Sequence, residues 1–242
     1  MSWVLVVTGT DTDVGKTIAT AALAAALRRT GSVAVDKPVQ TGVQPGEPGD
    51  VEEIARLASA VAISVGARLT RPMAPVQAAH REDAAAASLP TLAEHVARIT
   101  ALTALAEGAR GADTVLVEGS GGLLVHLDES GHTLADLAQA LQRHPSLDSR
   151  VVVVARAGLG TLNHTELTLE ALRARGLAVA GIVIGSWPRE PDEIALDNRD
   201  HLGALGAPLL GAIPEGAPRL APETFRREAP GWLPGLIGLE NP

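Results

Sequence analysis

Short runs of aliphatic residues alternate along the chain with longer segments in which apolar residues recur at helical spacing. Residues 3–8 form an apolar run that ends at Gly9, and residues 17–29 are rich in alanine and leucine. A run that is apolar at every position is typical of a strand buried on both faces, whereas an Ala/Leu-rich segment favours a helix. The same reasoning predicts strands at 32–35, 114–117, 151–155, 178–184 and 208–213, and helices from Asp50 onward and at 92–106, 133–141, 163–175 and 193–205.

Strands that alternate with helices predict an α/β fold, a doubly wound and mostly parallel sheet of about seven strands flanked by helices. A length of 242 residues suits one such domain, so we expect residues 1–242 to form a single domain. Residues 60–90 show no clear period; residues 71–79 are interpreted as a loop, and the AAAAS run after Asp83 as a short helix or an irregular segment. The proline-rich tail after Pro214 is either an extension over the surface or a mobile end.

Composition narrows the classes of protein. Only 2 % of the residues are aromatic although 46 % are hydrophobic, so the core must be aliphatic. A net charge of −8 disfavours a nucleic-acid partner, and the absence of cysteine excludes disulfides and thiolate metal sites. No basic and apolar leader precedes the first strand, and no apolar stretch approaches the ~20 residues that span a bilayer. We therefore expect a soluble, cytoplasmic protein that binds no membrane.

Lysine is rare in this chain. Of the 20 basic residues only Lys16 and Lys37 are lysines, so arginine supplies positive charge everywhere else. A lysine ammonium is a compact point charge that reaches a single oxygen, whereas the planar guanidinium prefers two. The two lysines are therefore candidates for contacts with individual phosphoryl or carboxylate oxygens.

The segment from Gly9 to Thr17, GTDTDVGKT, lies where the first strand passes into the first helix. Backbone N–H groups of such a loop converge on an anion, so Lys16 would reach the β and γ phosphate oxygens and the Thr17 hydroxyl would bind Mg²⁺. Five residues separate Gly9 from Gly15, one more than in the common P-loop string. The position between a strand and a helix still predicts a phosphate site and a P-loop NTPase-like fold.

This loop is shared with the ParA/MinD-type partitioning ATPases, which carry a signature lysine five positions before the GKT lysine. Here that position is Asp11. An acidic side chain cannot neutralise charge across a nucleotide sandwich, so Asp11 argues against that switch family. Acidic groups at Asp11 and Asp13, so near a phosphate, must instead face a cation such as a metal or an amine substrate.

Two further segments follow strands. KPVQTG begins at Lys37 and EGSGG begins at Glu118, which places both at the edge where ligands of open parallel sheets bind. A carboxylate at the tip of a buried strand suits Mg²⁺, and Asp50, interpreted as a helix N-cap, is a further oxygen donor. Thr17, Asp50 and Glu118 would together form an all-oxygen site suited to Mg²⁺. Histidine spacings typical of zinc sites and the G-x-S-x-G nucleophile motif are absent.

Taken together, TGTDTDVGKT, KPVQTG, VEGSGGLLV, GLGTLNHTELT and LLGAIP resemble the dethiobiotin synthetase family, in order and in spacing, over residues 4–214. The resemblance implies a cytoplasmic, homodimeric ligase of biotin biosynthesis that uses Mg²⁺ and ATP. Its substrates would be 7,8-diaminononanoate and CO₂ or bicarbonate, and its products dethiobiotin, a nucleoside diphosphate and phosphate. In that family an amine of the substrate captures CO₂ as a carbamate, the carbamate attacks the γ-phosphate, and the second amine closes the ring.

The resemblance also implies roles for individual residues. Lys16 and Lys37 would be catalytic, acting on the carbamate and the transferring phosphoryl group. Thr12, Asp13, Lys37 and Thr41 would surround the diamine, while Thr161, Leu162 and Asn163 would bind the substrate carboxylate across a homodimer interface. The nucleotide would be bound by Asp13, Val14, Gly15, Lys16, Thr17, Ile18, Glu118, Gly121, Gly185 and Pro214, and the metal by Thr17, Asp50 and Glu118.

The chain departs from the family at residues 184–188, IGSWP, where many members have Asn-Asp to read the adenine edge. We therefore expect weaker base discrimination, or discrimination by backbone near Pro214, and the co-substrate is ATP or another nucleoside triphosphate. Two alternatives remain, another P-loop ligase of the cobyrinate type and a nucleotide switch that binds a partner or membrane. The acidic charge, Asp11 and the lack of a recognisable amphipathic terminal helix count against the switch.

Overall fold

Seven strands form one sheet in the order β3-β2-β4-β1-β5-β6-β7, and every neighbouring pair is parallel. The computed structural model describes residues 2–59, 62–82, 88–103 and 112–238. This arrangement confirms the predicted parallel α/β fold. The strands are β1 (Ser2–Gly9), β2 (Val33–Thr41), β3 (Ala62–Leu69), β4 (Thr114–Gly122), β5 (Leu147–Ala155), β6 (Val179–Trp187) and β7 (Leu209–Pro214).

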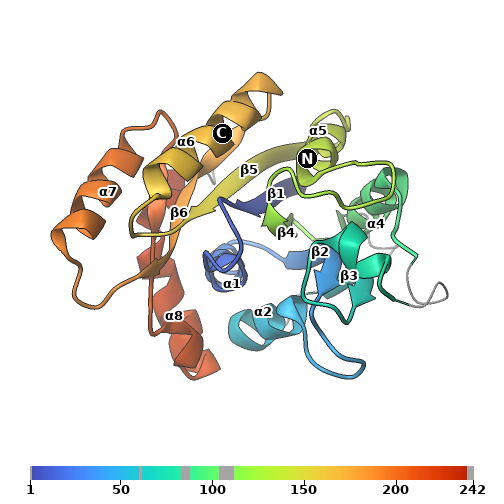
Figure 1. Ribbon diagram of the computed structural model, residues 1–242. Coiled ribbons are helices and arrows are strands. Elements are labelled where there is room, and N and C mark those ends of the chain that lie inside the picture. The colour runs from blue at the N-terminus through green and yellow to red at the C-terminus, as the bar shows by residue number, and fades with distance from the viewer. Residues whose placement is uncertain (1, 60–61, 83–87, 104–111, 239–242) are drawn as a thin grey trace.

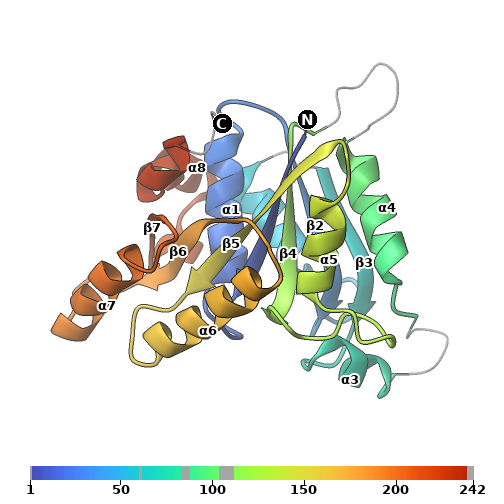
Figure 2. The same cartoon turned by 90° about the horizontal axis from the view of Figure 1, so that it is seen from above.

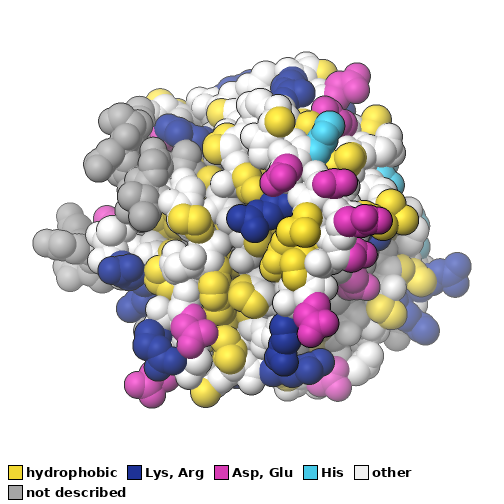
Figure 3. All heavy atoms as spheres, turned by 90° about the vertical axis from the view of Figure 1, so that its left-hand side faces the viewer, with side chains coloured by type: hydrophobic (Ala, Val, Ile, Leu, Met, Phe, Trp, Pro, Cys, Tyr) yellow, Lys and Arg dark blue, Asp and Glu magenta, His cyan; other side chains and the backbone are white. Residues whose placement is uncertain are grey.

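Helices cover both faces of the sheet (Figures 1 and 2). One face carries α1 (Lys16–Leu27), α2 (Asp50–Ala58) and α8 (Pro222–Trp232), and the other carries α4 (Leu92–Thr103), α5 (Leu134–Gln142), α6 (Thr161–Ala174) and α7 (Glu193–Gly203). The short helix α3 (Pro75–Ala79) contacts β2 and β3. Two 3₁₀ turns, Ala217–Arg219 and Pro234–Gly238, flank α8. The side of the molecule that lies on the left in Figure 1, where α7 is found, mixes acidic, basic and hydrophobic side chains (Figure 3).

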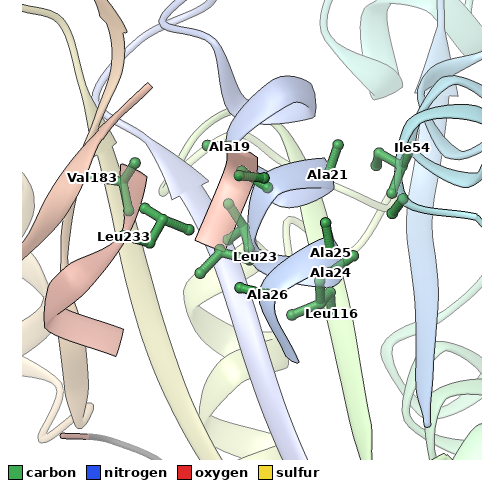
Figure 4. Close-up of a cluster of buried hydrophobic side chains, with 14 of the residues drawn as sticks. Ala19, Ala21, Leu23, Ala24, Ala25, Ala26, Ile54, Leu116, Val183 and Leu233 are labelled. Carbon is green, nitrogen blue, oxygen red and sulfur yellow. The ribbon is translucent and has the colours of Figure 1, made fainter. Parts of the chain in front are cut away.

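Helix α1 packs closely on the sheet because half of its side chains are alanines. Every residue from Ala19 to Leu27 is buried. Figure 4 shows these alanines between Ile54 of α2 on one side and Val183 and Leu233 on the other. Since α1 starts directly after the glycine loop, this packing fixes the loop against the sheet.

Strand β2 is longer than predicted, because it continues through Pro38 to Thr41 rather than ending near Val35. Pro38 has no N–H to donate, and the ladder with β3 passes from Lys37 to Val39 without it. β2 therefore remains paired with β3 up to the edge of the sheet where ligands bind.

The segment 60–90, which shows no clear period in sequence, contains the edge strand β3 and the helix α3. The prediction that residues 71–79 form a loop is wrong for Pro75–Ala79, where proline stands at the first helical position. The residues of the AAAAS run up to 87, and those of the predicted helix 92–106 beyond Thr103, lie outside the described residues.

The tail after Pro214 folds onto the domain, which corrects the expectation that no amphipathic helix is found near the end of the chain. Helix α8 buries Phe225 and Ala229 in the same core as α1, and Phe225 meets Trp232 edge to face with ring centroids 5.1 Å apart. The apolar side of α8 is therefore occupied by the protein's own core. Among the described residues, no helix is long and apolar enough to cross a membrane.

We expect α8 to unfold together with the sheet, as a single domain requires. Replacing the fully buried Phe225 by alanine should lower the free energy of unfolding by about 3–5 kcal/mol, because the ring leaves a cavity. Urea unfolding followed by circular dichroism measures this as a shift of one transition. Arg227→Ala, at an exposed position of the same helix, is the control and should change stability by less than about 0.5 kcal/mol. An unchanged midpoint for Phe225→Ala would contradict a shared cooperative unit.

Candidate active site

The glycine loop between β1 and α1 is built from unusual backbone conformations. Gly15, which caps α1, has φ +92°, and Asp13 has φ +56°. The loop is held to β5 by the N–H of Thr10, which donates to the Val154 carbonyl at 3.0 Å. The ammonium of Lys16 donates to the Asp11 carbonyl at 3.0 Å, so the loop curls around the lysine that follows it.

A cavity of about 690 Å³ opens beside this loop. Its lining brings together most of the residues predicted for phosphate, metal and diamine, namely Thr12, Asp13, Gly15, Lys16, Thr17, Ile18, Lys37, Thr41, Asp50, Glu118 and Gly121. These residues come from the loop, from the ends of β2 and β4 and from the start of α2, as the rule for ligand sites in parallel sheets predicts.

The Lys37 ammonium lies among acceptors where β2 and β4 separate. The two strands pair up to Asp36, and one residue later Lys37 Nζ lies 2.8 Å from Oε1 of Glu118. It also lies 2.6 Å from Oδ2 of Asp50 and donates to the Gly119 carbonyl at 3.2 Å. All three donor positions of the ammonium are therefore directed at protein oxygens.

The three predicted metal ligands lie next to one another. The Thr17 hydroxyl donates to Oε1 of Glu118 at 3.0 Å, and Asp50 approaches the same carboxylate through Lys37. The other oxygen of Glu118, Oε2, is buried without a hydrogen-bond partner among the described residues. Among the residues that the structure describes, no three acidic or histidine side chains are grouped so that they could hold a metal ion. A metal site here would therefore need the Thr17 hydroxyl beside the two carboxylates.

The two lysines respond differently to their surroundings. Burial, and then the positive charge of Lys37, lower the pKa of Lys16. Burial also disfavours the charged form of Lys37, but the carboxylates of Glu118 and Asp50 outweigh it and raise the pKa of Lys37. Both ammonium groups are almost inaccessible to solvent, since 8 % of Lys16 and 3 % of Lys37 is exposed. An anion bound beside Lys16 would compensate a charge that the protein itself leaves poorly balanced.

Asp50 is the first residue of α2 and not its N-cap, which corrects the interpretation from sequence. Gly49 is the N-cap, and its N–H donates to Glu52 at 2.7 Å. The N–H of Asp50 donates to the side chain of Gln40 at 2.8 Å. Its carboxylate is thus free of any capping role and pairs with Lys37, whose charge offsets the cost of burial and holds the pKa of Asp50 low.

Asp11, the residue that replaces the partitioning ATPases' lysine, forms an ion pair with Arg156 at 2.7 Å. Its other carboxylate oxygen accepts from the N–H of Thr12 at 2.8 Å. Chiefly because of that backbone contact, with help from Arg156, the pKa of Asp11 lies below its ordinary value. The cation beside Asp11 is therefore an arginine of the protein at the end of β5, and not the metal or amine substrate that the sequence analysis predicted.

Six predicted site residues do not line the cavity: Val14, Gly185, Pro214, Thr161, Leu162 and Asn163. Val14 is buried beneath the loop, and Gly185 packs on its backbone so closely that a Cβ there would lie 2.0 Å from the Val14 carbonyl oxygen. Thr161 to Asn163 form the first turn of α6, where the side chain of Thr161 is fully buried and that of Asn163 is exposed.

The sequence analysis did not identify several of the residues that line the cavity. Gln40, Gly42, Ser120 and Val125 line the cavity, together with residues 72–75. Gln40, Gly42 and Ser120 lie within the motifs KPVQTG and EGSGG, so their membership of these motifs could have predicted that they line the site. No local signal pointed to residues 72–75, because they reach the cavity only through the pairing of β3 with β2.

A parallel sheet with a lysine-bearing glycine loop at its carboxyl edge defines the class as P-loop nucleotide-binding proteins. In keeping with this class, residues 4–224 match the family described as an AAA domain. The fold also resembles the MinC:MinD cell division complex of Aquifex aeolicus, at a TM-score of 0.52 with 12 % identity, over 99 % of this chain and 90 % of that one.

Relatives of known name are much closer in sequence. The chain is 53 % identical to the ATP-dependent dethiobiotin synthetase BioD of Rhodococcus jostii, over 95 % of this chain and 94 % of the relative. It is 52 % identical to the protein of the same name from Streptomyces avermitilis, over 97 % and 93 %. The chain belongs to the ATP-dependent dethiobiotin synthetase family.

The contact between Gly185 and the loop allows a specific test. Gly185→Ala should weaken ATP binding by at least about tenfold, because its Cβ would force the backbone at Val14 and Gly15 to move. Isothermal titration calorimetry with ATP measures the change. Gly203→Ala, at a glycine with open space around it, is the control and should bind ATP as the unaltered protein does. Equal affinities for both variants would show that the loop does not depend on this contact.

Proposed function

We infer that this protein is an ATP-dependent dethiobiotin synthetase, a ligase of biotin biosynthesis. The observation that carries the inference is the convergence of Lys16, Lys37 and Glu118 in one cavity beside the glycine loop. Relatives about half identical over nearly the whole chain, each named ATP-dependent dethiobiotin synthetase, support the same activity.

The substrates that we propose are 7,8-diaminononanoate and CO₂. One amine adds to CO₂ and loses a proton to give a carbamate, whose oxygen then attacks the γ-phosphate and releases ADP. The second amine attacks the carbonyl carbon, phosphate leaves, and the cyclic urea is formed. Each step needs anionic oxygens to be held and oriented, so catalysis depends on positioning and electrostatic stabilisation.

Lys16 and Lys37 are proposed to supply that stabilisation. Lys16 follows the loop directly and, within the described part of the chain, its ammonium is seen to donate only to the Asp11 carbonyl, so it is available to the β and γ phosphates. Lys37, at the end of β2, is proposed to act on the carbamate and the transferring phosphoryl group. Because both side chains are almost fully buried, such charges act more strongly than they would in bulk solvent.

Mg²⁺ is proposed to bind at Thr17, Asp50 and Glu118. A hydroxyl and two carboxylates form the kind of oxygen donor set that Mg²⁺ prefers, and the unpartnered Oε2 of Glu118 supports the fit. When bound, the metal would neutralise charge on the phosphates. The protein's own contribution is to hold these donors at the end of β4 and the start of α2.

We propose that the rest of the cavity binds the diamine. Thr12, Asp13 and Thr41 offer polar groups to the amines, and Asp13 adds a negative charge. Pro72, Met73 and other apolar residues of the wall suit the hydrocarbon chain.

The nucleotide base is proposed to lie towards Gly185 and Pro214. The ends of β6 and β7 meet there, since the N–H of Glu215 donates to the Trp187 carbonyl at 2.9 Å. With no Asn-Asp pair in residues 184–188, discrimination between ATP and other nucleoside triphosphates would depend on backbone groups.

The first turn of α6 is proposed to bind the substrate carboxylate of a second copy in a homodimer. A helix N-terminus offers free N–H groups to an anion. Because the side chain of Thr161 is buried, its contribution would come from the backbone, and that of Asn163 from an exposed amide. The preceding Leu159 is 76 % exposed, which suits burial against a partner.

The direct test of the activity is to incubate the protein with 7,8-diaminononanoate, bicarbonate, Mg²⁺ and ATP. We expect phosphate and dethiobiotin to form in equal amounts, and phosphate release to require the diamine. Mass spectrometry detects dethiobiotin, and a coupled assay detects phosphate. ATP hydrolysis that is indifferent to the diamine would favour a different ligase or a nucleotide switch.

Lys37 should not tolerate arginine. The guanidinium is planar and wider than an ammonium, so Lys37→Arg should lower kcat by at least about 100-fold although the charge is kept. The dissociation constant for ATP should stay within about threefold, since Lys16 and the loop are unaltered. Arg56→Lys, an exposed exchange of the same two residue types on α2, is the control and should leave kcat unchanged. Near-normal turnover of Lys37→Arg would remove Lys37 from the mechanism.

A further inference from the structure

The Lys37 ammonium lies between the two carboxylates that are proposed to bind the metal. Its Nζ is 2.6 Å from Asp50 and 2.8 Å from Glu118, and the side chains of Lys37 and Glu118 are 4 % and 0 % exposed. A third contact, to the carbonyl oxygen of Gly119 at 3.2 Å, holds the ammonium in place. The protein thus carries its own counter-ion at this position.

A divalent cation on the same carboxylates would lie very close to this ammonium. Mg²⁺ binds oxygen ligands at about 2.0–2.1 Å, so an ion on Asp50 and Glu118 would compete with Nζ for the same oxygen atoms or lie against it. At such distances, away from water, repulsion between like charges is strong. Even binding at the free Oε2 of Glu118 would bring the ion close to Lys37, because both oxygens belong to one carboxylate.

The charge balance of the cavity gives the same result. Its charged lining residues are two lysines and three carboxylates, Lys16, Lys37, Asp13, Asp50 and Glu118. A free divalent cation would therefore leave an excess of positive charge beside the buried side chains of Lys37 and Glu118. A metal bound to a triphosphate brings anionic oxygen ligands of its own, so it depends less on these carboxylates to neutralise its charge.

We propose that Lys37 is the resident counter-ion of Asp50 and Glu118 and excludes free divalent cations from them, so that the metal binds only together with the nucleotide. This proposal rests on the metal ligands named under the proposed function. Arrival of the metal–nucleotide complex makes Lys37 give up a carboxylate contact and turn towards the phosphates. The lysine is therefore delivered to the reacting oxygens only when the nucleotide is in place.

The test is binding of Mn²⁺ to the nucleotide-free protein, measured by the decrease of the free-ion signal in electron paramagnetic resonance. Lys37→Met should bind Mn²⁺ at least about tenfold more tightly than the unaltered protein, because both carboxylates lose their counter-ion. Lys16→Met is the matched control, since it removes the same charge from the same cavity but from a residue whose ammonium donates to the Asp11 carbonyl. It should tighten Mn²⁺ binding clearly less than Lys37→Met does, because the Lys16 ammonium contacts a carbonyl whereas that of Lys37 contacts both carboxylates.

Circular dichroism checks that every variant is folded. Two further variants keep the test decisive if Lys37→Met alone is misfolded. Lys37→Gln keeps an amide donor for Glu118 and should also tighten Mn²⁺ binding. Adding Glu118→Gln to Lys37→Met removes a carboxylate and should return the affinity to that of the unaltered protein or below.

The unaltered protein gives an independent result, because Mn²⁺ should bind tightly once a non-hydrolysable ATP analogue is present. The proposal is overturned if the unaltered protein and Lys37→Met bind Mn²⁺ equally, or if Lys16→Met tightens binding as much as Lys37→Met does. Failure of the proposed function is recognised separately, as failure to form dethiobiotin while these Mn²⁺ affinities remain as expected.

Discussion

The buried ion group of Lys37, Asp50 and Glu118 is the constraint on which the site depends. Lys37 is 3 % exposed and Glu118 is fully buried. Burying a charge is costly unless a group of opposite charge lies beside it, so each of these side chains depends on the other. Their side chains come from β2, α2 and β4, so their pairing joins three elements where β2 and β4 separate. Removing Lys37 would leave both carboxylates without the cation that they share.

The rest of the fold holds the glycine loop against this group. The alanines of α1 let the helix lie close to the sheet, and the tail helix α8 covers α1 with Phe225. On the other side of the loop, Gly185 brings the end of β6 against Val14. Because helix, sheet and tail meet within one core, the loop is positioned by long-range packing as well as by its own glycines.

Sequence patterns predicted the buried strands, since strands covered on both faces are apolar at nearly every position. They did not reveal β3, an edge strand with exposed and half-buried positions, nor α3, which has five residues and too few turns to show a period. The sequence motifs identified Lys37 and Glu118 as candidate site residues. Their contact depends on β2 and β4 being neighbours in the sheet, and a local sequence pattern does not predict which strands are neighbours. For the same reason the role of Arg156 beside Asp11 emerged only from the fold.

The geometry also explains why lysine was retained at two positions in a chain that otherwise uses arginine. The ammonium of Lys37 has three oxygen acceptors at 2.6, 2.8 and 3.2 Å, which matches three donors that diverge from one point. A guanidinium directs its donors within a plane and could not satisfy these acceptors of β4 and α2 in the same volume. Lys16 is enclosed by the loop whose Asp11 carbonyl it contacts, so a larger head group would displace the loop itself. The identity of both lysines is therefore set by the space and the acceptors around one nitrogen atom, and not by charge alone.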